Sequence, residues 1–232
     1  NRTDPFSRSN HITTSTYLKY LVNKPNGLFI QTKGGETYKD SVDFMKANGK
    51  DNVVSYFTVT SNNNDILKKI EPGAPTFEDR LDQIKYSVKN GYKVIVAFNP
   101  LCEEWMPKDE YNKTFNMFVD AGVNHFIYQR LHMNSSDIKR FSQDRLYRFG
   151  VELEKATKRK GNGQQYLQEC LTEKLNSGVN VLAFGMPYKT DFFVDIRRQL
   201  GKCFPSNYDF FNYCFERGKG TYTFEDFITA LG

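Results

Sequence analysis

A rhythm of short apolar runs, each followed by a polar turn and then an amphipathic stretch, constrains the fold of this chain more than any other feature. The apolar runs are rich in β-branched and aromatic residues and cover 27–32, 53–60, 92–100, 125–132 and 179–187. Helical patterns lie at 13–23, 39–48, 76–90, 108–121, 136–157 and 164–177. Strands that alternate with helices of this length predict βαβ units and a parallel sheet. Right-handed crossovers then build either a doubly wound sheet or a closed or partial barrel.

The composition limits the partners that we expect. The chain has 232 residues, 25% of them charged and 39% hydrophobic, which suffices for one large α/β domain or two small ones. A net charge of +5 permits nucleic acid as a partner but does not require it. No apolar stretch reaches the length of a membrane span, so we expect no membrane partner. The four cysteines are spaced widely and irregularly, which favours reduced thiols in a cytoplasmic protein.

Polar residues stand at the ends of nearly all the predicted strands. In both α/β arrangements, functional residues gather where a strand ends and the next helix begins. The residues at these ends are Lys33, Thr58, Thr60, Asn99 and His132. Gly34 and Gly35 follow the lysine, and glycines let a backbone come close to a ligand. The set suits a small polar ligand with a carboxylate or a phosphate, but it specifies no reaction.

Each of these residues also has a purely structural interpretation. Lys33 alone is more typical of a solvated turn, and hydroxyl residues after a strand often cap the next helix. The Asn99-Pro100 pair is turn-prone, and a lone histidine such as His132 is more often a hydrogen-bonded structural residue. An amide at the end of an apolar run would be costly without a partner, so we expect one for Asn99.

The loop 71–76 and the helix after it form a second candidate constellation. Two prolines around a glycine stiffen the loop, and Thr76 is placed to cap the helix. Arg80 lies one turn into this helix, near its positive end, where an anion is stabilised. An ion pair between Glu71 and Arg80 that only staples the loop fits the spacing equally well. On a surface such a pair would contribute about 0–1 kcal/mol.

Five motifs follow one another along the first part of the chain. They are TDPF (3–6), IQTKGG (30–35), EPGAPTFEDRL (71–81), GYKVIVAFNPL (91–101) and AGVNHFIYQRLH (121–132). In this order they resemble the radical S-adenosylmethionine (radical SAM) enzymes of the DNA-repair-photolyase-like group, which includes spore photoproduct lyase. The resemblance covers residues 1–132. It implies an N-terminally incomplete, partial parallel (β/α)6 barrel over 1–135, and a mostly helical extension with one further strand over 136–232.

The resemblance implies a chemistry that needs a motif this sequence lacks. Members of the family hold a [4Fe-4S] cluster through three thiolates of a CxxxCxxC motif and bind S-adenosyl-L-methionine at the fourth iron. They generate a 5′-deoxyadenosyl radical, while the protein positions the reactants. The sequence contains no CxxxCxxC, which in the family precedes the TDP turn. We expect either that the sequence begins downstream of the motif or that the motif is lost, and a cluster only if an upstream CxxxCxxC exists.

Matched by position, the resemblance assigns roles to residues of this sequence. The residues assigned to the cofactor are Lys33, Thr58, Thr60, Arg80, Asn99 and Pro100. Those assigned to the substrate side are His132, Cys102 and Asp4. Lys33 and the two threonines would hold the methionyl part, and the glycines after Lys33 would make room for it. Arg80 would pair with the cofactor's carboxylate or lock Glu71, and the Asn99-Pro100 pair would cradle the adenosyl part.

We therefore expect a lyase-like radical SAM enzyme, or its fragment without the cluster loop, with an unknown substrate for which DNA stays open. Two other classes of protein remain compatible with the residues. One is a barrel enzyme whose strand ends bind a phosphorylated metabolite. The other is a binding module that keeps the fold without the cluster.

Overall fold

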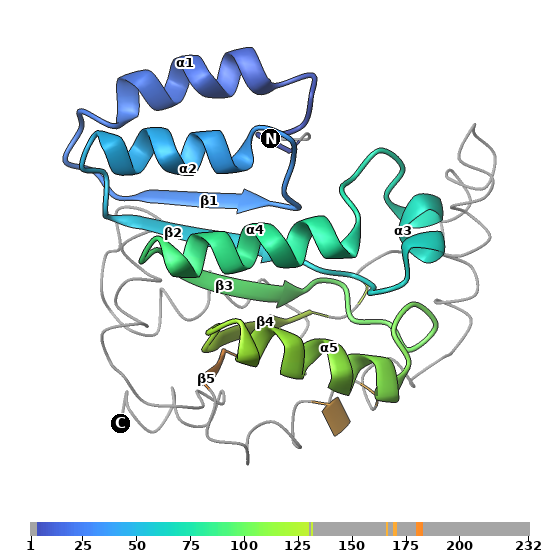
Figure 1. Ribbon diagram of the computed structural model, residues 1–232. Helices are drawn as coiled ribbons and strands as arrows, with labels where there is room; N and C mark the ends of the chain where they lie inside the picture. Colours follow the sequence, from blue (N-terminus) through green and yellow to red (C-terminus); the bar gives the residue numbers. More distant parts are fainter. Residues whose placement is uncertain (1–3, 130, 132–165, 167–168, 171–179, 183–232) are drawn as a thin grey trace, which may run out of the picture.

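The computed structural model describes residues 4–129, 131, 166, 169–170 and 180–182, in which strands alternate with helices (Figure 1). In chain order the elements are α1 (His11–Leu21), β1 (Leu28–Thr32), α2 (Tyr38–Ala47), β2 (Val53–Thr58), α3 (Asn64–Ile70), α4 (Phe77–Lys89), β3 (Lys93–Phe98), α5 (Lys108–Asp120), β4 (His125–Tyr128) and β5 (Asn180–Leu182). Most of the extension predicted over 136–232 lies outside the described residues, including the whole helix predicted at 136–157.

The five described strands form one parallel sheet in the order β1-β2-β3-β4-β5. Each strand pairs with the next one along the chain, so that Thr32 lies opposite Phe57 and Thr58 lies opposite Ala97. The predicted parallel α/β sheet is therefore confirmed. The order of these strands contains no reversal, and a reversal is the feature that a doubly wound sheet requires.

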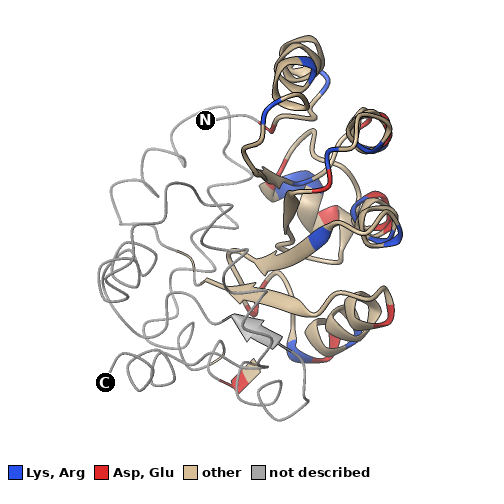
Figure 2. Cartoon of the chain, turned by 90° about the vertical axis from the view of Figure 1, so that its left-hand side faces the viewer, with Lys and Arg blue, Asp and Glu red and all other residues tan. Residues whose placement is uncertain are grey.

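In the described part of the chain, α1, α2, α4 and α5 lie in one layer on one side of the sheet. Figures 1 and 2 show α2, α4 and α5 along the strands, with α1 beside α2. A right-handed crossover that always moves in the same direction puts every connecting helix on the same face, which explains this arrangement. In Figure 2 many of the charged residues of the described part lie on these helices. None of the described helices combines the length and the apolar character that crossing a membrane requires.

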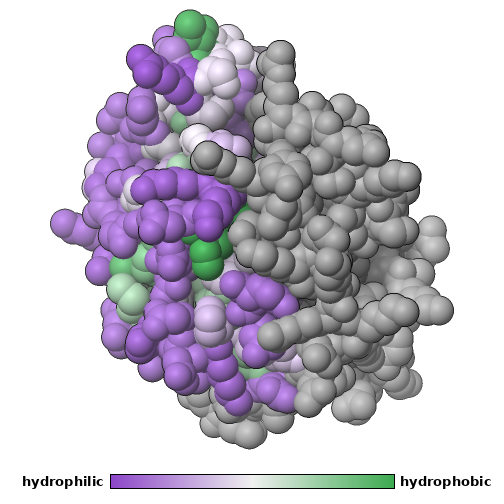
Figure 3. Space-filling view, turned by 90° about the vertical axis from the view of Figure 1, so that its right-hand side faces the viewer, coloured by the Kyte–Doolittle hydropathy of each residue, from purple (hydrophilic) through white to green (hydrophobic). Residues whose placement is uncertain are grey.

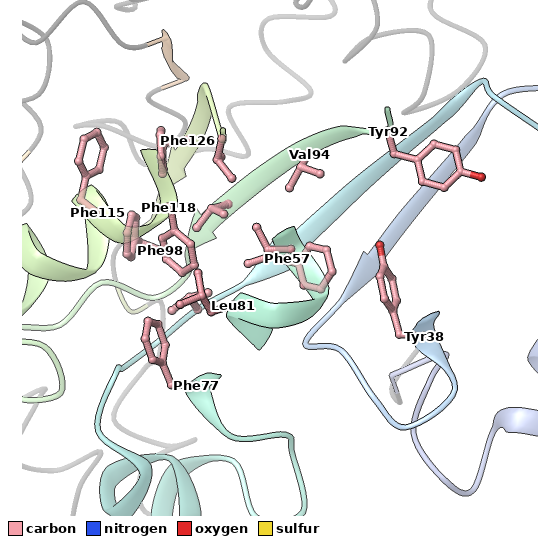
Figure 4. Packing of buried hydrophobic residues seen from close by; sticks show 14 of the residues in the cluster. Tyr38, Phe57, Phe77, Leu81, Tyr92, Val94, Phe98, Phe115, Phe118 and Phe126 are labelled. Atoms are coloured by element: carbon pink, nitrogen blue, oxygen red, sulfur yellow. The ribbon is translucent and has the colours of Figure 1, made fainter. Parts of the chain in front are cut away.

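An aromatic layer between the sheet and the helices forms the core (Figure 4). Phe98 of β3 packs against Tyr111 and Phe118 of α5, with ring centroids 5.2 and 6.2 Å away. Phe77 at the start of α4 meets Phe118 edge-on at 5.9 Å. Such pairs contribute about 0.5–1.5 kcal/mol beyond the apolar area that they bury. The high aromatic content of the described part is thus used largely to pack helices onto strands.

A buried tyrosine joins three elements of the fold through polar contacts. The side chain of Tyr38 in α2 is fully buried, and its hydroxyl lies 2.9 Å from Ser55 Oγ in β2 and 2.6 Å from Ser87 Oγ in α4. Burial raises the pKa of Tyr38 to about 12, against the opposite effect of the two serine hydrogen bonds. The hydroxyl therefore stays neutral and satisfied inside the core.

Helix α3 is an element that the sequence pattern does not predict. Its residues are Asn64–Ile70, two turns only, with Leu67 and Ile70 buried. Asn63 starts the helix, because its side chain accepts hydrogen bonds from the backbone N–H groups of Asp65 and Ile66. A helix this short offers too few apolar positions to establish a periodicity.

Candidate functional site

The candidate site lies at the carboxyl ends of the strands, where the loop 4–10 meets the end of β1. Figure 3 faces this side, and the described part of the surface is mostly hydrophilic with small separate hydrophobic areas. The Asp4 carboxylate accepts hydrogen bonds from the Phe6 N–H at 2.9 Å, the Thr32 hydroxyl at 2.8 Å and the Lys33 N–H. These donors belong to the protein, so Asp4 ties the loop to the strand. A substrate-facing role for Asp4 stays a prediction.

The two glycines after Lys33 accommodate the protein's own chain. A Cβ on Gly35 would lie 2.0 Å from the Phe6 carbonyl oxygen, and one on Gly34 would lie 2.4 Å from Gln83 Oε1. Gln83 also bonds both backbone groups of Gly35, with its Oε1 and Nε2 each at 3.1 Å. The glycines therefore make room for parts of the protein itself, and the expectation that they also make room for a cofactor stays a prediction. They leave space for the loop 4–10 and for Gln83, a residue that the sequence pattern did not single out.

Two cavities open beside Lys33. The larger, about 860 Å³, is lined by Lys33, Asp4 and Thr58 together with residues of α1 and β1. The smaller, about 390 Å³, lies among the loop 4–10 and residues 33–36 and 73–76. Lys33 and Asp4 line both. Both volumes fall within the range of about 300–1,000 Å³ that is typical of small-molecule sites.

The predicted site residues are only partly brought together. Lys33 and Thr58 share the larger cavity, as the sequence suggested. The predicted residues that line neither of these two cavities are Thr60, Arg80, Asn99, Pro100 and Cys102. Thr58, the last residue of β2, stands on the sheet face away from the helices, because its neighbour Phe57 packs into the helix-facing core.

Arg80 donates its hydrogen bonds to other groups of the protein. Its side chain is fully buried, and its donors reach Pro75 O and Thr58 O at 3.1 Å each and Glu71 Oε2 at 2.6 Å. Of the two roles that the resemblance allowed, the structure shows the one in which Arg80 locks Glu71. Because the pair is buried, the surface value of 0–1 kcal/mol does not apply to it. Removing one partner from such a pair typically costs about 3–5 kcal/mol.

Glu71 joins this buried arginine to the exposed lysine of the site. Its Oε1 lies 2.9 Å from Thr60 Oγ1 and 3.5 Å from Lys33 Nζ. The sequence placed Glu71 in the loop as a partner of Arg80, but its contacts with Lys33 and Thr60 could not be foreseen. Thr60 thus supports Glu71 rather than facing either cavity.

Asn99 has the hydrogen-bonding partner that its place in an apolar strand end predicts. Its side chain bonds the hydroxyl of Tyr56, and the peptide bond between Asn99 and Pro100 is cis. Burial raises the pKa of Tyr56 to about 12, and the Asn99 bond opposes that rise. The predicted contact of the Asn99-Pro100 pair with an adenosyl group stays a prediction.

Cys102 is buried rather than presented to a ligand. It is 6% exposed and packs with Ile70 and Trp105 in a small apolar cluster. Burial raises the pKa of its thiol to about 12; Glu104 adds to the rise and a backbone hydrogen bond from Leu131 opposes it. A protonated, buried thiol argues against the substrate-facing role expected for Cys102. His132, which the resemblance also assigns to the substrate side, lies outside the described residues.

The described residues do not provide the ligands of an iron–sulfur cluster. Within them no group of three or more His, Cys, Asp or Glu side chains could hold a metal ion. The two cysteines in this part, Cys102 and Cys170, are both buried and form no disulfide. Three neighbouring thiolates are what such a cluster needs, so the donor set found here does not fit one.

Comparisons with known proteins found no counterpart of this chain. No family model, no curated protein and no solved structure matches it. The resemblance to radical SAM enzymes therefore remains a hypothesis that rests on the sequence motifs. A function has to be inferred from the geometry around Lys33.

Proposed function

We propose that the strand ends around Lys33 bind the amino-acid part of S-adenosylmethionine, within a partial (β/α)6 barrel of the radical SAM type. The observation that carries the proposal is the position of Lys33. Its side chain is 38% exposed, stands between two cavities and is held by a carboxylate that is itself locked in place. A fixed and accessible ammonium is a suitable partner for a ligand carboxylate.

The backbone at the end of β1 favours a carboxylate over a phosphate. Phosphate sites use free backbone N–H groups that point at the anion. Here the three successive N–H groups of 33–35 donate to Asp4, to Thr32 Oγ1 at 2.8 Å and to Gln83 Oε1 at 3.1 Å. This turn therefore has no amide to offer a phosphate, which counts against the phosphorylated-metabolite alternative.

The larger cavity offers further groups that suit an adenosylated amino acid. Thr58 supplies a hydroxyl beside Lys33, and Tyr17 and Phe29 add aromatic rings to the lining. Aromatic rings can stack on a nucleobase, and such stacking contributes about 1–3 kcal/mol per base. The strand order, in which each strand follows its neighbour without reversal, is also the order that a β/α barrel needs.

Radical chemistry would need groups that the described residues do not contain. A [4Fe-4S] cluster, where bound, supplies the electron that cleaves S-adenosylmethionine. The residues of this chain that we can assign contribute binding, orientation and the exclusion of water from the ligand. Iron and acid-labile sulfide, measured on the anaerobically purified full-length gene product, separate a radical enzyme from a binding module. A purified protein that binds S-adenosylmethionine but contains no iron would support the binding module instead.

Binding of S-adenosylmethionine to a Lys33→Ala variant tests the proposal. We expect the Kd to rise about 10–100-fold, because a hydrogen bond to a charged group contributes about 1.5–3 kcal/mol. Isothermal titration calorimetry measures the change. Lys39→Ala is the matched control, because Lys39 is 40% exposed and also ion-paired, to Asp82, but lines neither cavity. Equal affinities of the wild type and Lys33→Ala would refute the role of Lys33.

A further inference from the structure

The Glu71 carboxylate lies where three separate segments of the chain meet. Its Oε1 accepts a hydrogen bond from Thr60, just after β2, and lies 3.5 Å from Lys33 Nζ, just after β1. Its Oε2 accepts a 2.6 Å bond from Arg80 in α4. A single side chain therefore couples two strand ends to the helix that covers them.

The burial of these groups gives them different roles. The exposed fractions of the side chains are 0% for Arg80, 9% for Glu71 and 38% for Lys33. Arg80 is further held by the carbonyl oxygens of Pro75 and Thr58. The carboxylate is thus immobilised from its buried side, and it in turn holds the ammonium that faces the cavities.

Glu71 also contributes to the charge that a ligand meets, next to Asp4, which lines both cavities. Two cations, Lys33 and Arg80, share this one carboxylate, so the group carries one net positive charge. Without Glu71 it would carry two. An additional positive charge attracts a dianion and repels a ligand such as S-adenosylmethionine, whose ammonium and sulfonium outnumber its carboxylate.

We propose that Glu71 is a positioning and specificity-determining residue: it holds the Lys33 ammonium in place and, by offsetting the charge of Arg80, selects an amino-acid carboxylate over a dianionic phosphate. This inference rests on the proposed function of Lys33. It adds a residue that lines neither cavity and acts through another side chain.

A Glu71→Gln variant tests the inference with two probes, S-adenosylmethionine and inorganic phosphate. We expect the affinity for S-adenosylmethionine to fall about tenfold and that for phosphate to rise about tenfold, as expected for one charge a few ångströms from the ligand. Calorimetric titration of both probes reads the two changes. A merely structural role would weaken both or neither, so changes of the same sign, or no change in either affinity, overturn the inference.

A second variant covers the case in which Glu71→Gln does not fold, since it leaves the Arg80 guanidinium buried without a counterion. The double variant Glu71→Gln/Arg80→Met removes the pair, and replacing a buried ion pair by neutral groups of similar size is often tolerated. Its net charge at the site equals that of the wild type. We expect the gain in phosphate affinity expected for Glu71→Gln to disappear, because the charge is restored, and S-adenosylmethionine binding to stay weaker than in the wild type, because Lys33 is no longer held. Unchanged binding of both probes overturns the positioning role.

A readout without ligand separates this inference from the proposed function. Acetylation of lysines by acetic anhydride, quantified by mass spectrometry, reports how firmly each ammonium is held. We expect Lys33 to react about threefold faster in Glu71→Gln, while Lys39 keeps its rate. Lys39 is the internal control because its exposure, 40% against 38%, matches that of Lys33. If the wild type does not bind S-adenosylmethionine, the proposed function fails; an unchanged Lys33 rate makes the inference fail.

Discussion

Gly35 has no side chain because another part of the protein occupies the place where one would be. The Phe6 carbonyl oxygen would lie 2.0 Å from its Cβ, and its backbone groups both bond Gln83. Arg80 is the opposite case, a long charged side chain whose hydrogen bonds run to carbonyl oxygens and to Glu71. Both residues look like ligand-binding residues in the sequence and prove to hold the site together. Lys33 and Thr58, by contrast, line the larger cavity and can meet a ligand there.

Replacing Gly35 by alanine tests this close approach. We expect Gly35→Ala to lower the free energy of unfolding by about 3 kcal/mol, because the methyl group forces the loop 4–10 off the end of β1. Gly49→Ala is the control, since its Cβ would meet open space and only its positive φ of 67° costs energy, about 1 kcal/mol. Urea denaturation measures both variants. Equal losses would contradict the packing seen at Gly35.

Helix α4 supplies side chains that hold the site in place. It begins at a capping box, in which Thr76 accepts a hydrogen bond from the Asp79 N–H at 3.1 Å and Asp79 accepts one from the Thr76 N–H at 3.2 Å. Arg80 and Gln83 follow within the next two turns and reach β2 and the turn after β1. The start of the helix therefore sets where the anchoring side chains stand.

The capping box predicts a measurable loss of stability in a Thr76→Ala variant. We expect a decrease of about 1 kcal/mol in the free energy of unfolding, the usual cost of removing an N-cap side chain. Thr76→Ser keeps the hydroxyl and should stay close to the wild type. Chemical denaturation of the three proteins gives the comparison. A Thr76→Ser variant as unstable as Thr76→Ala would show that the hydroxyl contributes nothing.

The described part of the molecule is a parallel sheet covered by one layer of helices. Strand β2 is buried on both of its faces. A titratable group at the amino end of β4 is buried as well. His125 is 9% exposed, and burial lowers its pKa to about 4, with the nearby Lys93 acting in the same direction. The folded protein thus holds this imidazole neutral over a pH range in which the unfolded chain would protonate it.

Stability should depend on pH through His125. Its folded pKa of about 4 lies below the ordinary 6.5, so the full contribution is present above pH 6.5 and is lost as the pH falls from 6.5 through 4. Complete protonation would cost about 3 kcal/mol. We expect the difference in unfolding free energy between the wild type and His125→Gln to shrink over this range. A difference that does not change between pH 8 and pH 5 would contradict the burial of a neutral histidine.

Within the described residues, most of the strands and helices could be predicted from the sequence with small errors in their bounds. Predicted strands at 27–32 and 92–100 became Leu28–Thr32 and Lys93–Phe98, and the helix predicted at 76–90 became Phe77–Lys89. These signals are local, because apolar periodicity and caps act over a few residues. The two-turn helix α3 escaped prediction because it is too short to show a periodicity. The ion pair between Lys33 and Glu71 was not predicted, because the two residues lie far apart along the chain.

By itself, the sequence determined the alternation of strands and helices, the parallel sheet and the position of polar residues at the ends of strands. Each of these follows from spacing and residue type within one segment. Only the tertiary structure decided that the glycines receive Phe6 and Gln83 and that Arg80 locks Glu71. Only it showed that Lys33 stands between two cavities. Those outcomes depend on which distant segments come within hydrogen-bonding distance, and packing in three dimensions sets that distance.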